Sequence, residues 1–293
     1  MGMTSDQQAH ERELHTAELD QAEACLRQVM RGLGSAMVAL SGGVDSSLVA
    51  AIGAQELPHR VVAVTGVSAL FLPDDLARAR ALAWQLGIEH LEVPLDHLSL
   101  PGVAENPPDR CYHCKLAIFS RFRDLQHLLG LGWLVDGANA DDGLDYRPGQ
   151  LAAQEIGVRS PLAECGLDKG AVRHLSQRLG LPDPGRPAMA CLASRFPYGT
   201  PITASGLERV RRGEEALATL GFRGARLRHH GDVARIEVAT GDLDRLFSER
   251  RRVLAALADL GYLYICADLA GYRMGSLNAA LGLGGRQGEG EVS

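Results

Sequence analysis

The sequence has no long hydrophobic run, although 46% of its 293 residues are hydrophobic. No stretch approaches the roughly 18 consecutive apolar residues that mark a membrane-spanning helix. The N-terminal segment is polar and lacks the apolar core of a secretion signal. These two absences predict a cytoplasmic protein that has no membrane partner.

The sequence also lacks a basic excess and is poor in aromatic residues. Its 30 Lys and Arg are outnumbered by 36 Asp and Glu, which gives a formal net charge of −6. Phe, Tyr and Trp together make up 5% of the chain. Nucleic-acid-binding proteins usually carry a basic surface, and many RNA-binding modules stack bases on aromatic side chains. The composition therefore disfavours nucleic acid as the main partner.

Cysteine is scarce as well, with six residues in the chain. In the cell interior these thiols are expected to be reduced, so a disulfide framework is not predicted. Isolated cysteines commonly pack as small apolar side chains, and we expect this role for Cys25, Cys165 and Cys266. The other three cysteines lie in motifs that indicate metal or redox chemistry.

Short apolar runs alternate with helical patterns along the first part of the chain. The apolar runs cover residues 36–40, 60–65, 89–94 and 133–136, and the helical patterns cover 14–31, 46–55, 74–86 and 116–129. This alternation predicts an α/β fold, a parallel sheet with helices on both faces. In such sheets ligands bind beyond the carboxyl ends of the strands.

The pattern changes after a Pro-rich segment at residues 181–187. A helical stretch precedes two short β-like runs, and a second helical stretch and a last strand follow. This order predicts a small C-terminal α+β domain. We therefore expect a first domain over residues 1–195, a second over 196–280, and a disordered tail over 281–293.

The loop Ser-Gly-Gly-Val-Asp-Ser-Ser at residues 41–47 follows an apolar run and opens a helix. Two glycines allow backbone N–H groups to approach phosphate oxygens, and the helix adds its positive end. The string resembles the PP-loop of the ATP pyrophosphatase superfamily, whose members cleave ATP between the α and β phosphates and form an adenylate. The resemblance implies that Asp45 holds the loop or orients Mg²⁺. It implies that ATP is bound by Ser41, Gly42, Gly43, Asp45, Ser46 and Ser47.

Acidic residues gather after the apolar run at 133–136. Asn139 and Asp142 are predicted to contact the nucleotide, and Asp141 is a further candidate for Mg²⁺ or substrate. The alternative is a solvated turn, because Asp and Asn favour turns in any protein. The roles of Asp136 and Asp145 stay open between these interpretations.

Cys111 and Cys114 form a Cys-x-x-Cys pair just before a helix, where Arg110 favours thiolates. Cys191 lies near the predicted domain boundary. Three thiolates can hold an iron–sulfur cluster and leave one iron open. They can also form most of a zinc site, with His113 as a sterically awkward fourth ligand.

Several motifs occur in one order along the chain, at residues 41–47, 106–115, 136–149, 160–162 and 190–195. Together they resemble the LarE family, the sulfur transferases that help to build the nickel-pincer nucleotide cofactor of lactate racemase. The resemblance spans about residues 15–280. It implies ATP-dependent adenylation of a carboxylate of pyridinium-3,5-biscarboxylic acid mononucleotide. Sulfur then replaces an oxygen to give a thiocarboxylate.

Two branches of this family differ in their sulfur source. In one branch a single cysteine, which matches Cys191, gives up its sulfur and becomes dehydroalanine. The presence of Cys111 and Cys114 resembles the other branch, which carries a [4Fe-4S] cluster on three cysteines. The resemblance therefore implies that Cys111, Cys114 and Cys191 are both catalytic and cluster ligands. It also implies a homo-oligomer, since family members commonly form hexamers.

Candidate substrate contacts follow Cys191 and continue into the second domain. Ser194 and Arg195 can present a hydroxyl and a guanidinium fork to an anion. Arg226 and Arg228 alternate on a strand and share one face. The resemblance suggests that these two arginines bind the nucleotide phosphate, whereas an exposed basic strand is the alternative.

Other residues keep more than one interpretation. Glu214 and Glu237 either orient the arginines, bind a metal or lie on the surface, and His229 and His230 indicate a hairpin turn near a ligand. Three other functions also remain open. They are a tRNA thiolase of the same superfamily, an ammonia-dependent amidating ligase, and a non-catalytic nucleotide-sensing or metal-storage module.

Overall fold

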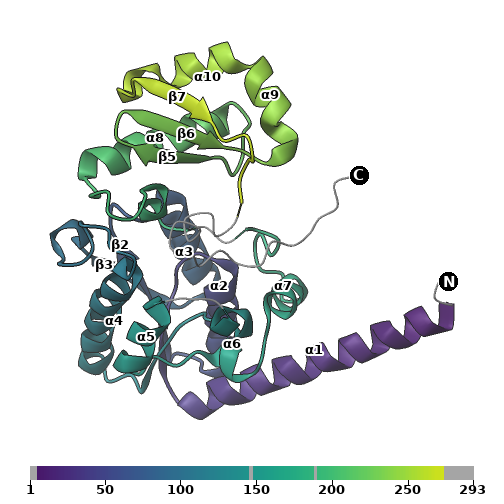
Figure 1. Cartoon of the computed structure of the whole chain (residues 1–293). Helices are drawn as coiled ribbons and strands as arrows, with labels where there is room; N and C mark the ends of the chain where they lie inside the picture. Colours follow the sequence, from purple (N-terminus) through teal and green to yellow (C-terminus); the bar gives the residue numbers. More distant parts are fainter. Residues whose placement is uncertain (1–4, 145–147, 188–189, 274–293) are drawn as a thin grey trace. The chain divides into compact units, whose positions relative to one another are not determined.

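The computed structural model describes residues 5–144, 148–187 and 190–273 (Figure 1). The described chain divides into two compact units. Among the described residues, the first unit draws on 5–68, 73–95, 115–144 and 148–187. The second draws on 69–72, 96–114 and 190–273.

These units differ from the two contiguous domains expected from the sequence. The chain enters the second unit twice before Ala190, at Ala69–Leu72 and Asp96–Cys114. Such short excursions carry no change in composition that a sequence pattern would reveal. As a result, Cys111 and Cys114 belong to the same unit as Cys191. The tail predicted over 281–293 lies outside the described residues.

The first unit is built on a four-stranded sheet in which every neighbouring pair is parallel, as predicted. Its strands are β1 (Ala36–Ala39), β2 (Val61–Val67), β3 (Glu89–Pro94) and β4 (Trp133–Val135), in the order β3-β2-β1-β4. The order reverses between β1 and β4. Parallel sheets of this kind bind ligands at the carboxyl edge beside such a reversal.

Helices flank this sheet (Figure 1). They are α1 (Ser5–Leu33), α2 (Val44–Glu56), α3 (Pro73–Leu86), α4 (Arg110–Leu128), α5 (Pro148–Ile156), α6 (Pro161–Glu164) and α7 (Lys169–Arg178). Val38 of β1 belongs to a core shared with α1, α2, α3, α6 and α7. The neighbouring Met37 points to the opposite face, because side chains alternate along a strand, and is fully buried there. Both faces are therefore covered.

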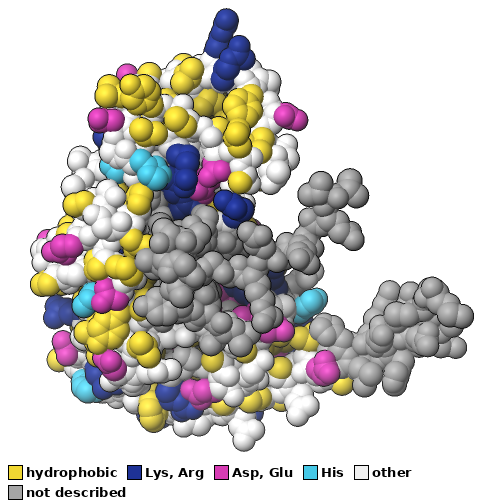
Figure 2. Space-filling model, viewed as in Figure 1, with side chains coloured by type: hydrophobic (Ala, Val, Ile, Leu, Met, Phe, Trp, Pro, Cys, Tyr) yellow, Lys and Arg dark blue, Asp and Glu magenta, His cyan; other side chains and the backbone are white. Residues whose placement is uncertain are grey.

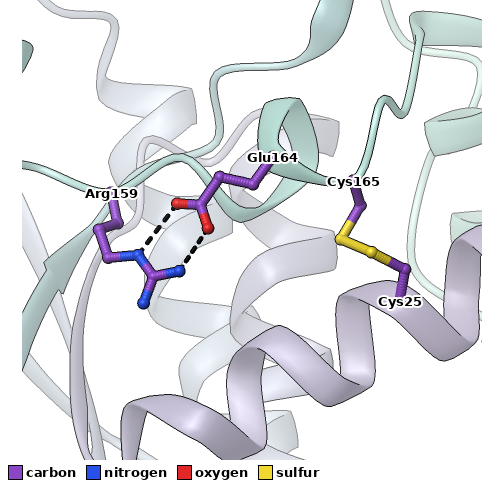
Figure 3. Close-up of a disulfide and its surroundings, with 4 residues drawn as sticks. All are labelled: Cys25, Arg159, Glu164 and Cys165. Atoms are coloured by element: carbon purple, nitrogen blue, oxygen red, sulfur yellow. Dashed lines mark hydrogen bonds and ion pairs between the residues drawn. A yellow bond between two sulfur atoms is a disulfide. The ribbon is translucent and has the colours of Figure 1, made fainter.

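The cysteine prediction is wrong for one pair. Cys25 of α1 and Cys165, which follows α6, form a disulfide (Figure 3). Their Cα atoms are 5.9 Å apart, an ordinary separation for a disulfide, but the cysteines are 140 residues apart in the chain. No local pattern could reveal that pairing. The prediction of burial is also wrong for Cys266, which is exposed.

Replacing Cys25 by Ser should lower the free energy of unfolding by about 2–4 kcal/mol, because the unfolded chain loses a cross-link. Denaturation under oxidising conditions measures this loss. Cys266→Ser, which removes an exposed thiol, is the matched control and should change little. With excess dithiol the wild type should unfold together with Cys25→Ser. Identical unfolding of Cys25→Ser and oxidised wild type would show that the disulfide does not form.

The second unit contains a three-stranded sheet with a hairpin. Strands β5 (Arg226–His230) and β6 (Val233–Glu237) are antiparallel, and β7 (Tyr264–Ala267) lies parallel to β6. The helices of this unit are α8 (Ala204–Thr219), α9 (Leu243–Ser248) and α10 (Arg250–Leu257). Leu227, Ile236 and Val210 share one core, which places α8 against one face of the sheet. The α+β prediction is confirmed.

Short 3₁₀ helices connect these elements. They are η1 (His97–Ser99), η2 (Ala140–Leu144), η3 (Leu192–Arg195), η4 (Thr240–Asp242) and η5 (Ala258–Leu260). Two of them follow predicted site residues, since η2 begins after Asn139 and η3 begins after Cys191. Among the described helices, none combines the length and hydrophobicity that a membrane span requires.

Candidate active site

The loop between β1 and α2 is closed by its own hydroxyl groups. The Oγ atom of Ser46 accepts the N–H of Ser41 at 3.1 Å and donates to the Gly43 carbonyl at 3.2 Å. Ser47 donates to the same carbonyl at 2.8 Å. The N–H groups of the first turn of α2, which starts at Val44, have no acceptor within the helix. The loop therefore presents an anion-binding helix terminus in a fixed conformation.

Two glycines are required by close backbone approaches around this loop. Gly42 adopts a left-handed conformation with φ of 75°, and a Cβ atom there would overlap the Asp75 carbonyl. A Cβ atom at Gly137, just after β4, would overlap the backbone of Ser46. The loop after β4 is thus in close backbone contact with the loop after β1, at the point where the strand order reverses.

Asp45 lies at the centre of the polar contacts in this region. Its carboxylate accepts from Asn139 Nδ2 at 3.4 Å and forms an ion pair with Lys169 at the start of α7. Lys169 in turn donates its backbone N–H to Asp141 at 2.9 Å. The structure brings together Asp45, Asn139 and Asp141, as their positions at strand ends predicted. Lys169 was missed, because nothing near it in the sequence indicates its contact with Asp45.

The acidic loop after β4 has contacts typical of a turn, and it also lies beside a carboxylate that is suited to bind Mg²⁺. Asp142 accepts the N–H of Asn139 at 3.1 Å, and Asp136 accepts the N–H of Ala138 at 3.1 Å, as turn residues do. Asp45 keeps 23% of its side chain exposed beside the anion-binding loop. Mg²⁺ needs only one or two protein carboxylates when it also binds phosphates and water. Asp45 fits that requirement.

Cys111, Cys114 and Cys191 are partly buried and lie outside the Cys25–Cys165 disulfide, and Arg110 interacts with the first and the last of them. The Arg110 guanidinium is 3% exposed and donates to Cys111 Sγ at 3.7 Å. Burial lowers the pKa of Arg110, but the sulfur groups of Cys191 and Cys111 raise it, so the pKa lies above its usual value. A buried cation therefore interacts with both cysteine segments.

Asn106 forms hydrogen bonds that connect the segment of Cys111 to the segment that follows Cys191. It is fully buried with φ of 56°, and its Nδ2 donates to the carbonyls of Pro197 at 2.7 Å and Thr200 at 3.1 Å. Its Oδ1 accepts from Arg110, which also donates to the Ala193 carbonyl at 3.1 Å. These contacts hold the Cys-x-x-Cys segment against the residues that follow Cys191. The sequence motif contained Asn106 but did not reveal this role.

The described residues contain no group of three Cys, His, Asp or Glu side chains that could hold a metal ion. The zinc alternative gains no support, because His113 Nε2 lies 3.3 Å from Asp109 instead. An iron–sulfur cluster is larger than one ion and uses soft thiolate ligands. Cys111 and Cys191 beside the buried Arg110 cation match the chemistry of such an anionic group.

Arg195 is completely buried, and each nitrogen of its guanidinium group donates a hydrogen bond. Its Nε and Nη2 atoms donate to the two carboxylate oxygens of Glu214, each at 2.8 Å. Its Nη1 donates to the carbonyls of Cys191 at 3.1 Å and Ala190 at 2.7 Å. Ser194 Oγ also donates to the Cys191 carbonyl at 2.8 Å. In this arrangement Arg195 and Ser194 fix the backbone at Cys191.

Glu214→Ala should lower the free energy of unfolding by about 3–5 kcal/mol, because it leaves the Arg195 charge buried and unpaired. Glu215→Ala is the matched control on the same helix, since Glu215 is 57% exposed and pairs with Arg211. That exposed pair should contribute less than about 1 kcal/mol. Chemical denaturation compares the two variants. Equal losses would contradict the role assigned to the buried pair.

Arg226 and Arg228 share one face of β5, as predicted, and both are buried. Arg228 donates to the Ser194 carbonyl at 2.8 Å and pairs with Glu237. Burial lowers the pKa of Arg226, and the nearby Arg195 charge lowers it further. The burial of both side chains contradicts the alternative of an exposed basic strand. Glu237 orients Arg228, one of the roles considered from the sequence.

The two histidines of β5 differ in their surroundings. His229 is buried, its Nδ1 lies 2.9 Å from the Tyr262 hydroxyl, and its ring packs on Phe196. His230 is exposed at the start of the predicted hairpin turn. Burial lowers the pKa of the His229 ring. His229 therefore acts as a packing residue of the second core.

The Ser-Gly-Gly-Val-Asp-Ser-Ser loop connects β1 of a parallel sheet to the buried helix α2, and the loop after β4 lies against it. This arrangement defines the PP-loop class of ATP pyrophosphatases. The family model described as asparagine synthase matches residues 19–108, which include this loop. An uncharacterised Synechocystis protein is 42% identical over 258 residues, 87% of this chain and 96% of that protein.

The pyridinium-3,5-bisthiocarboxylic acid mononucleotide synthase of Lactiplantibacillus plantarum is 37% identical over 266 residues, 90% of this chain and 96% of that enzyme. The chain therefore belongs to the LarE family. The tRNA-specific 2-thiouridylase MnmA of Sphingopyxis alaskensis is 28% identical over 192 residues, 52% of this chain and 49% of that enzyme. That likeness covers only about half of each protein.

Proposed function

We propose that this chain is an ATP-dependent sulfur transferase that acts on pyridinium-3,5-biscarboxylic acid mononucleotide. The observation that carries the proposal is the 37% identity, over 90% of the chain, to a pyridinium-3,5-bisthiocarboxylic acid mononucleotide synthase. The fold supports it with an ATP-binding loop of the required class. The product is a thiocarboxylate, a precursor for nickel-pincer cofactor synthesis.

In the first half-reaction a substrate carboxylate oxygen attacks the α-phosphorus of ATP, and the bond to the β-phosphate breaks. The first turn of α2, together with Gly42 and Gly43, binds the phosphates, with Ser41, Ser46 and Ser47 shaping the loop. Asp45, with help from Asn139, would hold the Mg²⁺ that neutralises phosphate charge. Lys169 offsets the negative charge that gathers on the departing pyrophosphate.

In the second half-reaction a sulfur nucleophile attacks the activated acyl carbon, and AMP leaves with the former carboxylate oxygen. Arg226 and Arg228 bind the phosphate of the substrate nucleotide. Arg195 and Ser194 hold the backbone at Cys191. A [4Fe-4S] cluster on Cys111, Cys114 and Cys191 would supply a sulfide, so that the protein keeps its own cysteines.

The cluster is favoured over a sacrificial Cys191 by the surroundings of the other cysteines. Cys111 lies against a buried guanidinium that also interacts with Cys191. A sacrificial route would use Cys191 alone and leave Cys111 and Cys114 without a role. A buried cation lowers the cost of the negative charge that a cluster and its thiolates carry.

The test is substrate-dependent pyrophosphate release under argon. We expect release with ATP, Mg²⁺ and the biscarboxylate nucleotide, together with a product in which mass spectrometry finds sulfur in place of oxygen. Release dependent on tRNA would instead support the thiolase alternative, which the partial likeness to MnmA favours. Release dependent on ammonia would support the amidating ligase.

The visible face of the molecule agrees with a small-molecule substrate. On the face drawn in Figure 2, outside the grey atoms, Lys and Arg side chains are scattered among acidic and apolar ones. RNA binding requires broader basic surfaces. By family resemblance we also propose a cytoplasmic homo-oligomer, with a hexamer as the expected state, which sedimentation measures.

A further inference from the structure

Arg186, between α7 and Cys191, touches two parts of the ATP-binding region. Its Nη1 donates to the Gly42 carbonyl at 3.4 Å, and its Nη2 donates to Asp75 Oδ1 at 2.7 Å. The Arg186 and Asp75 side chains are 17% and 21% exposed. This mostly buried ion pair is therefore attached directly to the phosphate-binding loop. Neither residue was a candidate from the sequence.

The loop segment at Gly42, which Arg186 contacts, is tightly packed against the backbone of Asp75. Gly42 is left-handed, and a single added carbon would overlap the Asp75 carbonyl. The loop and the first turn of α3 are thus in close backbone contact. A change in the loop when phosphates bind must be accommodated by Asp75, by Arg186, or by both.

The segments of Asp75 and Arg186 both lead into the second unit. Asp75 lies just after Ala69–Leu72, and Arg186 lies just before Ala190. Within the second unit the two segments are joined again, because the Leu192 N–H donates to the Leu70 carbonyl at 2.8 Å. Cys191 directly precedes Leu192. The same two segments are therefore linked at the ATP loop and beside Cys191.

We infer that Arg186 is a positioning residue that couples nucleotide binding at Gly42 to the segment that carries Cys191. Phosphate binding at the loop acts on the Gly42 carbonyl and the Asp75 pair, and the paired segments carry the change to Leu192. The inference rests on the proposed function only in requiring that ATP binds the loop. This coupling between the ATP loop and the Cys191 segment would coordinate adenylation with sulfur transfer.

Hydrogen exchange of the backbone over residues 190–196 tests this coupling in the full-length protein. The probe is Mg²⁺ with an ATP analogue that cannot be cleaved between the α and β phosphates. In the wild type the analogue should change the exchange rate at Leu192 by at least about fivefold, the lower end of ordinary coupling between sites. Arg186→Gln should abolish this dependence at saturating analogue. It should also raise KM for ATP about tenfold with a smaller effect on kcat.

Arg78→Gln is the matched control. Arg78 is on the same helix as Asp75 and pairs with Asp183 of the Arg186 segment, but this pair is exposed. The control should keep the wild-type response, and Arg186→Lys should restore part of it. The inference is overturned if the wild type shows no response, if Arg186→Gln keeps it, or if Arg78→Gln loses it equally. Sulfur transfer is not measured, so failure of the proposed function would leave this readout intact.

Discussion

Asp45→Asn should slow AMP and pyrophosphate formation by at least about 100-fold, the usual cost of removing one group that stabilises charge in a transition state. Asp45 is next to the anion-binding loop and is held by Asn139 and Lys169. The amide lacks the charge that Mg²⁺ requires and no longer pairs with Lys169. Pyrophosphate release at saturating substrate measures the effect.

The control for this variant is Asp183→Asn. Asp183 belongs to the same unit and also pairs with a cation, but 58% of its side chain is exposed. Its loss should leave the rate within about twofold of the wild type, since exposed ion pairs contribute little. A normal rate in Asp45→Asn would remove Asp45 from the chemistry.

Cys191→Ser should abolish thiocarboxylate formation while adenylation continues. The segment should keep its fold, because Arg195 and Ser194 hold the Cys191 carbonyl and not its side chain. An alcohol is a poor substitute for a soft thiolate, either as a cluster ligand or as a sulfur source. Mass spectrometry of the nucleotide product, together with pyrophosphate release, separates the two half-reactions.

Two companion variants sharpen this result. Cys266→Ser, at an exposed position of β7, should retain full sulfur transfer. Cys111→Ser separates the two sulfur sources, since only the cluster route needs Cys111. Full sulfur transfer in Cys111→Ser would contradict the cluster and leave Cys191 as the donor.

Features set by local pattern could be predicted from the sequence. The strand β1 is short and apolar, α2 is buried along most of its length, and the glycines between them permit a tight turn. Each of these depends on neighbours within a few residues. The polar loop after β4 could be placed beside that turn, because the carboxyl ends of parallel strands meet at one edge.

Features set by distant contacts could not be predicted. Lys169 contacts Asp45 across 124 residues, and Arg186 contacts Gly42 across 144. The Cys25–Cys165 disulfide is equally remote in sequence. Arg195 is buried because it pairs with Glu214 of another helix. The sequence motif around Cys191 indicated a charged side chain there, but not that this side chain points toward Glu214. Each case needs the packed tertiary structure.

In the proposed function, this chain adenylates the pyridinium nucleotide and then delivers sulfur from a site made by Cys111, Cys114 and Cys191. The most direct measurement counts sulfur-containing product per chain under argon, with sulfide, ATP and Mg²⁺ present, alongside the mass of the intact protein. We expect several thiocarboxylates per chain and an unchanged protein mass. At most one product per chain, with hydrogen sulfide lost from Cys191, would contradict it, and so would a product without sulfur.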